Sequence, residues 1–114
     1  MRSAARLVSE MQEVGYDRLL TLIATESRNV LVDFGSPSHA PYRIMSPFLN
    51  RIAQTRHESW CFVSINVDDQ SRAASHFDVK ALPTLICFAN GVETHRLMGA
   101  VPVRAIDELL AALS

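Results

Sequence analysis

Cysteine is scarce in this sequence, and the cysteines present form no recognisable motif. The chain of 114 residues has two, Cys61 and Cys87, and each stands inside an apolar run. Their separation matches neither a CxxC pair nor a zinc-ligand spacing. Both are therefore expected to be small buried hydrophobes in a reducing compartment.

Histidine pairs with a metal-binding spacing are missing as well. His57, His76 and His95 lie in separate segments and show no His-x-x-x-His or similar pattern. Zinc sites are usually recognised by closely spaced ligands of this kind. We therefore expect no metal site and no cofactor.

Long apolar runs and a strong charge of either sign are also absent. No run reaches the length of a membrane span, and the net charge is −1 with 20% charged residues. Neither nucleic acid nor a membrane is favoured as a partner by these features. The first residues, MRSAARLVSEMQEV, contain no continuous apolar region, so no secretory signal is predicted and the expected location is cytoplasmic.

The composition is otherwise that of a globular protein, with 48% hydrophobic residues, and the length predicts a single domain over residues 1–114. The structure of residues 1–15 is ambiguous, because Leu7, Val8 and Met11 fit either a short first strand or part of an N-terminal helix. Asp17 is then predicted to cap a helix. The apolar residues of that helix are Leu19, Leu20, Leu22 and Ile23.

Residues 29–53 predict a strand, a tight loop and a helix in succession. The strand, residues 30–34, is apolar except for Asp33, and a turn-rich loop over residues 35–38 follows. Pro41 falls in the first turn of the helix, and Pro47 is expected to kink it on the way to Arg56. The apolar residues at helical spacing are Ile44, Met45, Phe48, Leu49, Ile52 and Ala53. Because open α/β folds usually hold their sites in such strand-to-helix loops, we expect a site here.

The second half of the chain predicts further strands and helices. Residues 60–67 form a strand that is apolar on both faces, and Asp68 and Asp69 are expected to cap a helix over residues 70–77. Asn90-Gly91 predicts a hairpin between the strands at residues 83–88 and 93–98.

A bulge or a close backbone approach is expected at Gly99. The last helix is predicted to begin near Pro102. Its apolar face consists of Val103, Ile106, Leu109, Leu110 and Leu113. The order of elements predicts an α/β fold: a mixed sheet with a central parallel crossover, a C-terminal antiparallel hairpin and helices on both faces.

Several separated motifs resemble the thioredoxin family. The strand VLVDF is followed by a loop, a proline in the first helical turn and a second proline inside the helix. The later motifs are Val67-Asp68, Phe77-Asp78-Val79, Leu82-Pro83-Thr84, Asn90-Gly91 and Gly99-Ala100. The resemblance extends over residues 16–113 and implies the three-layer thioredoxin-like fold. Where the family has Trp-Cys-Gly-Pro-Cys, this sequence has Ser38-His39-Ala40-Pro41-Tyr42, so both redox cysteines are absent.

The missing cysteines determine the functional expectation. Disulfide exchange needs one thiolate that attacks and a second thiol that resolves the mixed disulfide, and neither His39 nor Tyr42 can form one. We therefore expect no catalytic residues, no dithiol–disulfide oxidoreductase activity and a protein that is not an enzyme. His39 lies near a predicted helix N-terminus and could act there as a base or electrophile. Ser36, Ser38 and Asp33 are near it in sequence, which suggests a Ser–His–Asp arrangement. Without a nucleophile-elbow pattern, an exposed polar loop residue is the simpler interpretation.

Two further residues are interpreted from the resemblance. Tyr42 stands at the position of the resolving cysteine, so its ring is expected to fill the space under the loop, with a ligand contact as the alternative. Asp33 matches the family's buried aspartate, which shuttles a proton to that cysteine. A carboxyl inside an apolar strand should have a raised pKa, and we expect it to bond to Tyr42, Ser64 or a buried water.

The role of Pro83 in the family does not depend on the cysteines. The resemblance implies a cis Leu82–Pro83 bond that faces the loop and presents the backbone of Leu82 to an extended peptide. The predicted binding surface, called the saddle below, consists of Ser38, His39, Ala40, Pro41, Leu82, Pro83, Gly99 and Ala100. It is expected to bind another protein or an extended peptide segment through strand-like hydrogen bonds and apolar contacts.

Three functions fit these observations. The main expectation is a redox-inactive thioredoxin-like protein that binds a polypeptide as a scaffold, a chaperone-like holder or an assembly factor. The alternative is a thioredoxin-related oxidoreductase with a degenerate site that uses an external thiol, or a thiol-binding enzyme of the glutathione type that uses Tyr42. The third is a structural subunit whose homodimer forms through the saddle.

Overall fold

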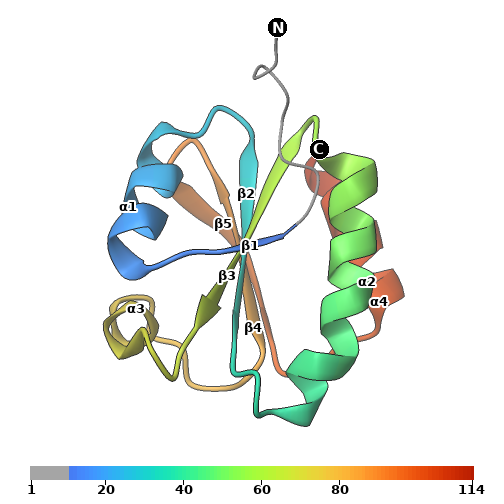
Figure 1. Cartoon of the computed structure of the whole chain (residues 1–114). Helices are drawn as coiled ribbons and strands as arrows, with labels where there is room; N and C mark the ends of the chain where they lie inside the picture. Colours follow the sequence, from blue (N-terminus) through green and yellow to red (C-terminus); the bar gives the residue numbers. More distant parts are fainter. Residues whose placement is uncertain (1–10) are drawn as a thin grey trace, which may run out of the picture.

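The computed structural model describes residues 11–114, and one five-stranded sheet forms its centre (Figure 1). The strands lie in the order β1-β3-β2-β4-β5. Their bounds are β1 Gln12–Glu13, β2 Asn29–Gly35, β3 Trp60–Asn66, β4 Thr84–Ala89 and β5 Val92–Met98. β1 and β2 both pair with β3 in parallel, whereas β4 runs antiparallel to β2 and to β5. The predicted mixed sheet with its parallel crossover and terminal hairpin is therefore confirmed.

Helices cover both faces of this sheet. Their bounds in the described chain are α1 Tyr16–Thr25, α2 Ala40–Arg56, α3 Ser71–His76 and α4 Val103–Leu113. α1 and α3 lie on one face and α2 and α4 on the other, to the left and right of the edge-on sheet in Figure 1. Among residues 11–114, no helix has the length and apolar character that crossing a membrane requires.

Side chains of β2 alternate between two apolar clusters, one on each face of the sheet. Leu31 packs with α2 and α4, whereas Val32 and Phe34 pack with α1 and α3. The helices complete these clusters with residues that are fully buried, such as Leu49 and Leu110 on one side. Burial on both faces explains why the sequence of this strand is almost continuously apolar.

The helix caps predicted from sequence are wrong. α1 begins after Gly15, and Asp17 lies within its first turn. α3 begins after Gln70, and within residues 11–114 no side chain caps either helix. Asp68 instead accepts a hydrogen bond from Ser36 Oγ at 2.6 Å. Its carboxylate therefore joins two loops rather than starting a helix.

The N-terminal segment is described from Met11 onward, and Leu7 and Val8 lie outside the described residues. Gln12 and Glu13 pair with β3, and the N–H of Met11 donates to Asn50 Oδ1 at 3.1 Å. The described part of this segment therefore fits the strand alternative and not the helix.

The hairpin between β4 and β5 has the predicted turn. Asn90 and Gly91 have φ angles of 53° and 80°, both positive, as a type I′ turn requires. Gly99 has a φ of 80°, and its N–H donates to the carbonyl of Pro83 at 2.7 Å, which is the close backbone approach expected there. The irregularity in pairing lies elsewhere, between Cys87 and Phe88.

α2 runs unbroken through Pro47, as predicted, but its buried stripe is narrower than expected. The buried residues are Met45, Leu49, Ile52 and Ala53. Ile44 and Phe48, which the sequence placed in the same stripe, are 66% and 42% exposed. Each lies one position before a buried residue. Because successive side chains are about 100° apart around a helix axis, the side chains of Ile44 and Phe48 point away from the sheet. They form a separate apolar surface.

The two cysteines lie on opposite faces of the sheet. Cys87 is buried in the cluster with α2 and α4, and Cys61 is half-buried against the cluster with α1 and α3. Burial raises the pKa of both thiols, that of Cys87 to about 12. The interpretation as small buried hydrophobes is confirmed for Cys87 and holds in part for Cys61.

Cys87 should react with a thiol reagent only when the fold opens, because it is buried and its thiolate is disfavoured. The Cys61→Ser variant reports Cys87 alone, and we expect its labelling by Ellman's reagent to be slow in the native protein and complete in denaturant. The Cys87→Ser variant should label faster, since Cys61 is half-buried. Immediate labelling of native Cys61→Ser would contradict the buried position of Cys87.

Candidate functional site

Three loops lie side by side at one end of the sheet. Phe34 of β2 lies opposite Thr84 of β4, and Thr84 lies opposite Met98 of β5. The loop after β2, the loop before β4 and the loop after β5 therefore share one edge, at the lower end of the sheet in Figure 1. These loops, with the first turn of α2, contain every residue of the saddle.

The loop before β4 has the cis Leu82–Pro83 bond that the resemblance implied. Its flanks are held by hydrogen bonds, from the Gly99 N–H to the Pro83 carbonyl at 2.7 Å and from Thr84 Oγ1 to the Ala81 carbonyl at 2.6 Å. Among the described residues, the N–H and C=O of Leu82 have no backbone hydrogen-bond partner. An extended peptide can pair with such groups.

The saddle is not uniformly exposed. Ser38, Ala40 and Ala100 are exposed, whereas Pro83 is buried and Leu82 is half-buried. Pro83 therefore shapes the loop from beneath and offers little contact surface of its own. The accessible apolar part of the saddle is narrower than predicted, and small side chains dominate it.

The loop between β2 and α2 is held by hydrogen bonds of its serines. Ser36, which is 4% exposed, donates through Oγ to Asp68 Oδ2 at 2.6 Å, and its Oγ lies 2.8 Å from Ser38 Oγ. The backbone N–H of His39 donates to the Ser36 carbonyl at 2.9 Å. In the described structure, no hydrogen bond joins the His39 ring to a serine or to Asp33. A Ser–His–Asp arrangement is therefore not formed.

His39 directly precedes α2, and its side chain makes no capping hydrogen bond. Its ring atom Nδ1 is buried and has no partner among residues 11–114. The first turn of α2 contains no acidic residue, so no carboxylate there neutralises the partial positive charge of the helix N-terminus. This end of α2 therefore favours an anion, and the same field would stabilise a thiolate.

The ring of Tyr42 fills the space beneath this loop. It packs so closely on Gly35 that a methyl group at that position would overlap the Cδ1 and Cε1 atoms of the ring. Burial raises the pKa of Tyr42, and the nearby Asp33 carboxyl acts in the same direction, whereas Ser64 opposes them. The packing agrees with the interpretation of Tyr42 as a space-filling residue.

Asp33 is buried, with 1% exposure, and its Oδ1 has no hydrogen-bond partner in the described chain. The expected bond to Tyr42 or Ser64 is not formed. Burial raises the pKa of this carboxyl from 3.8 to about 7. The strand register sets Asp33 beside Ser64, and Ser64 beside Glu13, so polar residues form a row across three strands.

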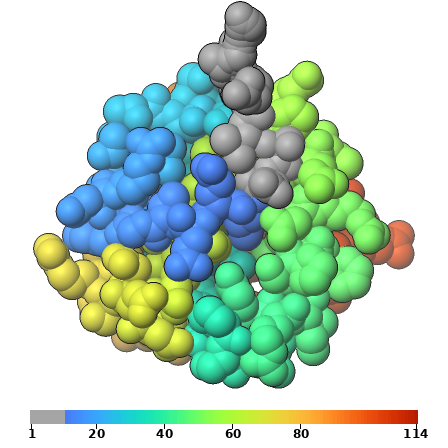
Figure 2. All heavy atoms as spheres, in the orientation of Figure 1, coloured from blue at the N-terminus to red at the C-terminus, as the bar shows by residue number. Residues whose placement is uncertain are grey.

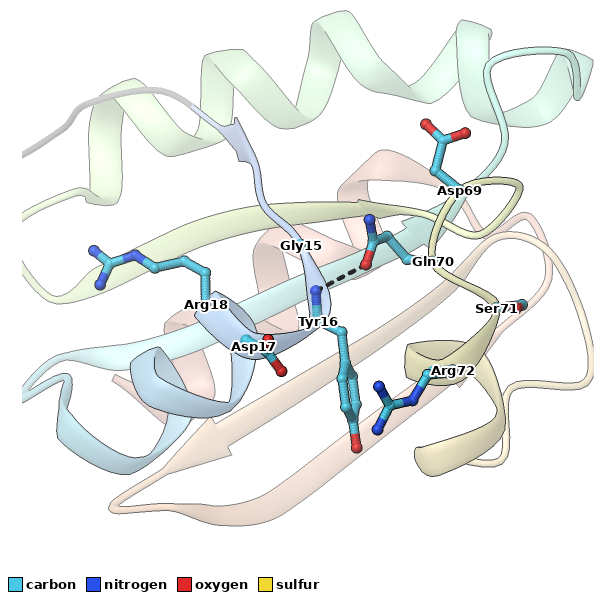
Figure 3. A pocket seen from close by; sticks show the side chains of 8 residues that line it. All are labelled: Gly15, Tyr16, Asp17, Arg18, Asp69, Gln70, Ser71 and Arg72. Carbon is cyan, nitrogen blue, oxygen red and sulfur yellow. Dashed lines mark hydrogen bonds between the residues drawn. The ribbon is translucent and has the colours of Figure 1, made fainter.

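A pocket that the sequence did not predict lies between the first turns of α1 and α3 (Figure 3). Its volume is about 420 Å³, and its lining consists of Gly15, Tyr16, Asp17, Arg18, Asp69, Gln70, Ser71 and Arg72. Gln70 Oε1 accepts a hydrogen bond from the Tyr16 N–H at 2.9 Å, and the Arg72 guanidinium lies 4.9 Å from the centre of the Tyr16 ring. These contacts tie together the starts of two helices. Tyr16 and Gln70 are 54 residues apart, so no local sequence pattern indicated the pocket.

Metal-ligating side chains do not gather at this edge or elsewhere in the described chain. Among residues 11–114, no group of three or more His, Cys, Asp or Glu side chains is placed to hold a metal ion. The chemistry available at the saddle is therefore that of its backbone groups, of His39 and of the α2 N-terminus.

The Asp33→Asn variant should be more stable than the wild type near and above neutral pH. The folded pKa of about 7 exceeds the unfolded value near 3.8, so wild-type stability falls as pH rises between these values and then levels off. The raised pKa corresponds to a loss of about 4 kcal/mol of wild-type stability at high pH. Urea unfolding of the variant and the wild type across this pH range measures the difference in their free energies of unfolding. Asp17→Asn, at an exposed position, is the matched control. If Asp33→Asn and the wild type differed in free energy of unfolding by the same amount at every pH, the raised pKa would be contradicted.

Gly35→Ala should be destabilising by about 1–3 kcal/mol, because its methyl group meets the Tyr42 ring. Combining it with Tyr42→Ala should cost less than the sum of the two single changes, since the ring is then gone. Gly15→Ala is the matched control, because its methyl group would make only ordinary contacts with Gln70, at 3.6 Å or more. Additive effects of Gly35→Ala and Tyr42→Ala would show that the two residues do not pack together.

Known proteins are similar to this chain in sequence and in fold. The thioredoxin family model matches residues 10–112 of the chain. A thioredoxin of Porphyra purpurea is 36% identical over 81 residues, covering 71% of this chain and 76% of that protein. A thioredoxin of Mycoplasma genitalium is 32% identical over 103 residues, covering 90% and 97%. The structure of a mutant thioredoxin from Halobacterium salinarum NRC-1 superposes with a TM-score of 0.83 at 25% identity, covering 91% of this chain and 90% of that one.

These relatives contradict the expectation that the chain is not an enzyme. They are named thioredoxins, and thioredoxins are dithiol–disulfide oxidoreductases. The expectation rested on the chain's own thiols alone, and it ranked the alternative, in which another molecule supplies the thiol, below a protein without enzymatic activity. The family match includes the strand, the loop, the cis-proline turn and the last helix. The chain belongs to the thioredoxin family.

Proposed function

We propose that this protein is a thioredoxin-related oxidoreductase that acts on disulfides of an extended polypeptide together with an external small thiol. One observation carries the proposal: in a chain of the thioredoxin family, the cis Leu82–Pro83 turn and the N-terminus of α2 lie at one edge of the sheet. The Leu82 backbone, which has no backbone partner among residues 11–114, lies at the same edge as the N-terminus of α2, and His39 and Tyr42 stand where the family resemblance places the cysteines. The thioredoxin relatives support an oxidoreductase over other classes of protein.

The proposed chemistry uses two molecules of a small thiol such as glutathione. The first attacks, as a thiolate, one sulfur of the substrate disulfide, which breaks, so that a mixed disulfide forms and one substrate thiolate leaves. The second attacks the small-thiol sulfur of the mixed disulfide, which releases the other substrate thiolate and the oxidised small thiol. Both substrate thiolates take up protons, and two electrons pass from the small thiols to the substrate.

The chain contributes binding and electrostatics to these steps. The Leu82 backbone would pair with the substrate strand, and the small side chains of Ala40 and Ala100 would leave room for it. The N-terminus of α2, which has no acidic residue in its first turn, would stabilise the attacking thiolate. We also propose a cytoplasmic location, where small thiols are abundant and reduced.

A second candidate function at the same surface is holding a polypeptide, as a scaffold, chaperone-like protein or assembly factor. The observation that favours it is the ring of Tyr42, which packs on Gly35 in the space of the second cysteine and leaves the Leu82 edge open. This function needs only the binding part of the mechanism. A homodimer formed through the saddle would compete with either function.

The test is the reduction of insulin by glutathione with and without this protein. We expect the wild type to raise the rate about tenfold over glutathione alone, which corresponds to about 1.4 kcal/mol of barrier. Ala40→Glu and Ala100→Glu should remove the increase, because a carboxylate there repels the thiolate and obstructs the peptide. Val92→Glu is the control, since Val92 is 64% exposed at the other end of β5. Circular dichroism and thermal melts establish that each variant folds.

The outcomes separate the two candidate functions. If the wild type gives no rate increase but binds oxidised insulin B chain, and Ala100→Glu does not bind it, the function is holding. If neither effect is seen, both proposals are wrong. The double variant His39→Cys/Tyr42→Cys is the positive control, because it places both required thiols at the α2 N-terminus. Size-exclusion chromatography of wild type and Ala100→Glu tests the homodimer.

A further inference from the structure

α2 has a charge that the chain as a whole does not show. Its sequence, APYRIMSPFLNRIAQTR, contains Arg43, Arg51 and Arg56 and no acidic residue. The whole chain has a net charge of −1, so the compensating carboxylates lie on other elements. Arg56 is paired with Asp107 of α4 at 3.0 Å. Within residues 11–114, Arg43 and Arg51 form no ion pair with a carboxylate.

These two arginines flank an exposed apolar surface, which we call the α2 outer face. It consists of Arg43, Ile44, Pro47, Phe48 and Arg51, all of which are exposed. Ile44 is 66% exposed and Phe48 42%, and the guanidinium of Arg51 lies 6.0 Å from the centre of the Phe48 ring. Figure 2 shows α2, in green, open along one side of the molecule. Large apolar side chains that gather on a surface in this way often mark an interaction site.

The α2 outer face continues into a groove between α2 and α4. The groove has a volume of about 420 Å³ and is lined by Arg51, Ile52, Thr55, Val103, Arg104 and Asp107. Asp107 is occupied by Arg56, whereas Arg104 and Glu108 form only an exposed pair at 3.4 Å. Such an exposed pair contributes little and leaves its members open to other partners. The groove is therefore apolar at its base and cationic at its rim.

We propose that the α2 outer face and this groove bind an acidic amphipathic helix of a partner protein. The apolar side of that helix would cover Ile44 and Phe48 and enter the groove, which is the usual geometry of a helix bound between two helices. Carboxylates beside its apolar residues would pair with Arg43 and Arg51. Arg43 lies beside the saddle, since its Nη1 donates to the Pro37 carbonyl at 3.1 Å. The rest of this surface runs along α2 away from the saddle, so the inference does not rest on the proposed function.

Charge decides between this occupant and a second copy of the chain. A twofold dimer through the α2 outer face would set Arg43 and Arg51 against the same residues of the other copy. Like charges across an interface oppose association, whereas carboxylates of a partner would favour it.

The test selects binding peptides from a random library and compares their charge and their pattern of apolar residues. A phage-displayed library of random peptides about 16 residues long offers about four helical turns to the folded protein. We expect the peptides that bind the wild type, but not Arg51→Glu or Phe48→Ser, to be acidic and to have apolar residues three and four positions apart. Arg72→Glu and Val92→Ser are matched controls, since they make the same kinds of change on α3 and β5. They should retain the selected peptides.

The selected peptides are then measured by fluorescence anisotropy. Each α2 variant should weaken binding about tenfold, which corresponds to about 1.4 kcal/mol, and added salt should weaken it further. Ala100→Glu should bind as the wild type does, which separates this surface from the saddle. The inference is overturned if neutral or basic peptides are selected, or if only Ala100→Glu loses them. Dimerisation abolished by Phe48→Ser, or Arg51-dependent binding to phosphatidylserine vesicles, would assign the face to those occupants instead.

Discussion

The pairing of β2 with a strand on each side fixes most of this structure. Phe34 lies opposite Ile65 of β3 and opposite Thr84 of β4, so the end of β2 is held from both directions. A shift of one residue would send each side chain of β2 to the opposite face and would disrupt two apolar clusters at once. Burial therefore specifies the register. The register in turn sets the start of α2 beside the cis-proline turn.

The site that results keeps its geometry while its reactive atoms differ from those of the family. The ring of Tyr42 packs on Gly35 and requires a glycine there, because no side chain fits between the ring and the strand. Asp33 stays buried beneath, without a partner for its Oδ1 among the described residues. The Leu82 backbone, which has no hydrogen-bond partner among the described residues, and the N-terminus of α2, whose first turn has no acidic residue, are independent of both. Under the proposed function, peptide binding and thiolate stabilisation depend on these two features and not on thiols at positions 39 and 42.

The sequence predicted the fold well because its signals were local and repeated. The apolar strands, the Asn90-Gly91 turn and the amphipathic last helix each depend on neighbouring residues, and the structure contains all of them. The errors occurred where contacts between residues far apart in the sequence determine the local structure. Asp68 accepts a hydrogen bond from Ser36 across the fold instead of capping the helix that follows it. Ile44 and Phe48 were placed in one apolar stripe with residues that are buried, because the spacing of apolar residues does not show how the helix is oriented relative to the sheet.

The net charge of the whole chain is −1, and this value does not show that the charged side chains of α2 are all basic. α2 is positive at its N-terminus through backbone dipoles and along its outer face through Arg43 and Arg51. The distance along the helix from Ala40 to Arg51 is about 16 Å at about 1.5 Å per residue. The Debye length at physiological ionic strength is about 8 Å, so a thiolate at one end and carboxylates near Arg51 interact little through solvent. Arg43, by contrast, lies only about 4.5 Å along the helix from Ala40 and donates to the Pro37 carbonyl. Only the Arg51 end of the outer face is therefore electrostatically separate from the N-terminus of α2.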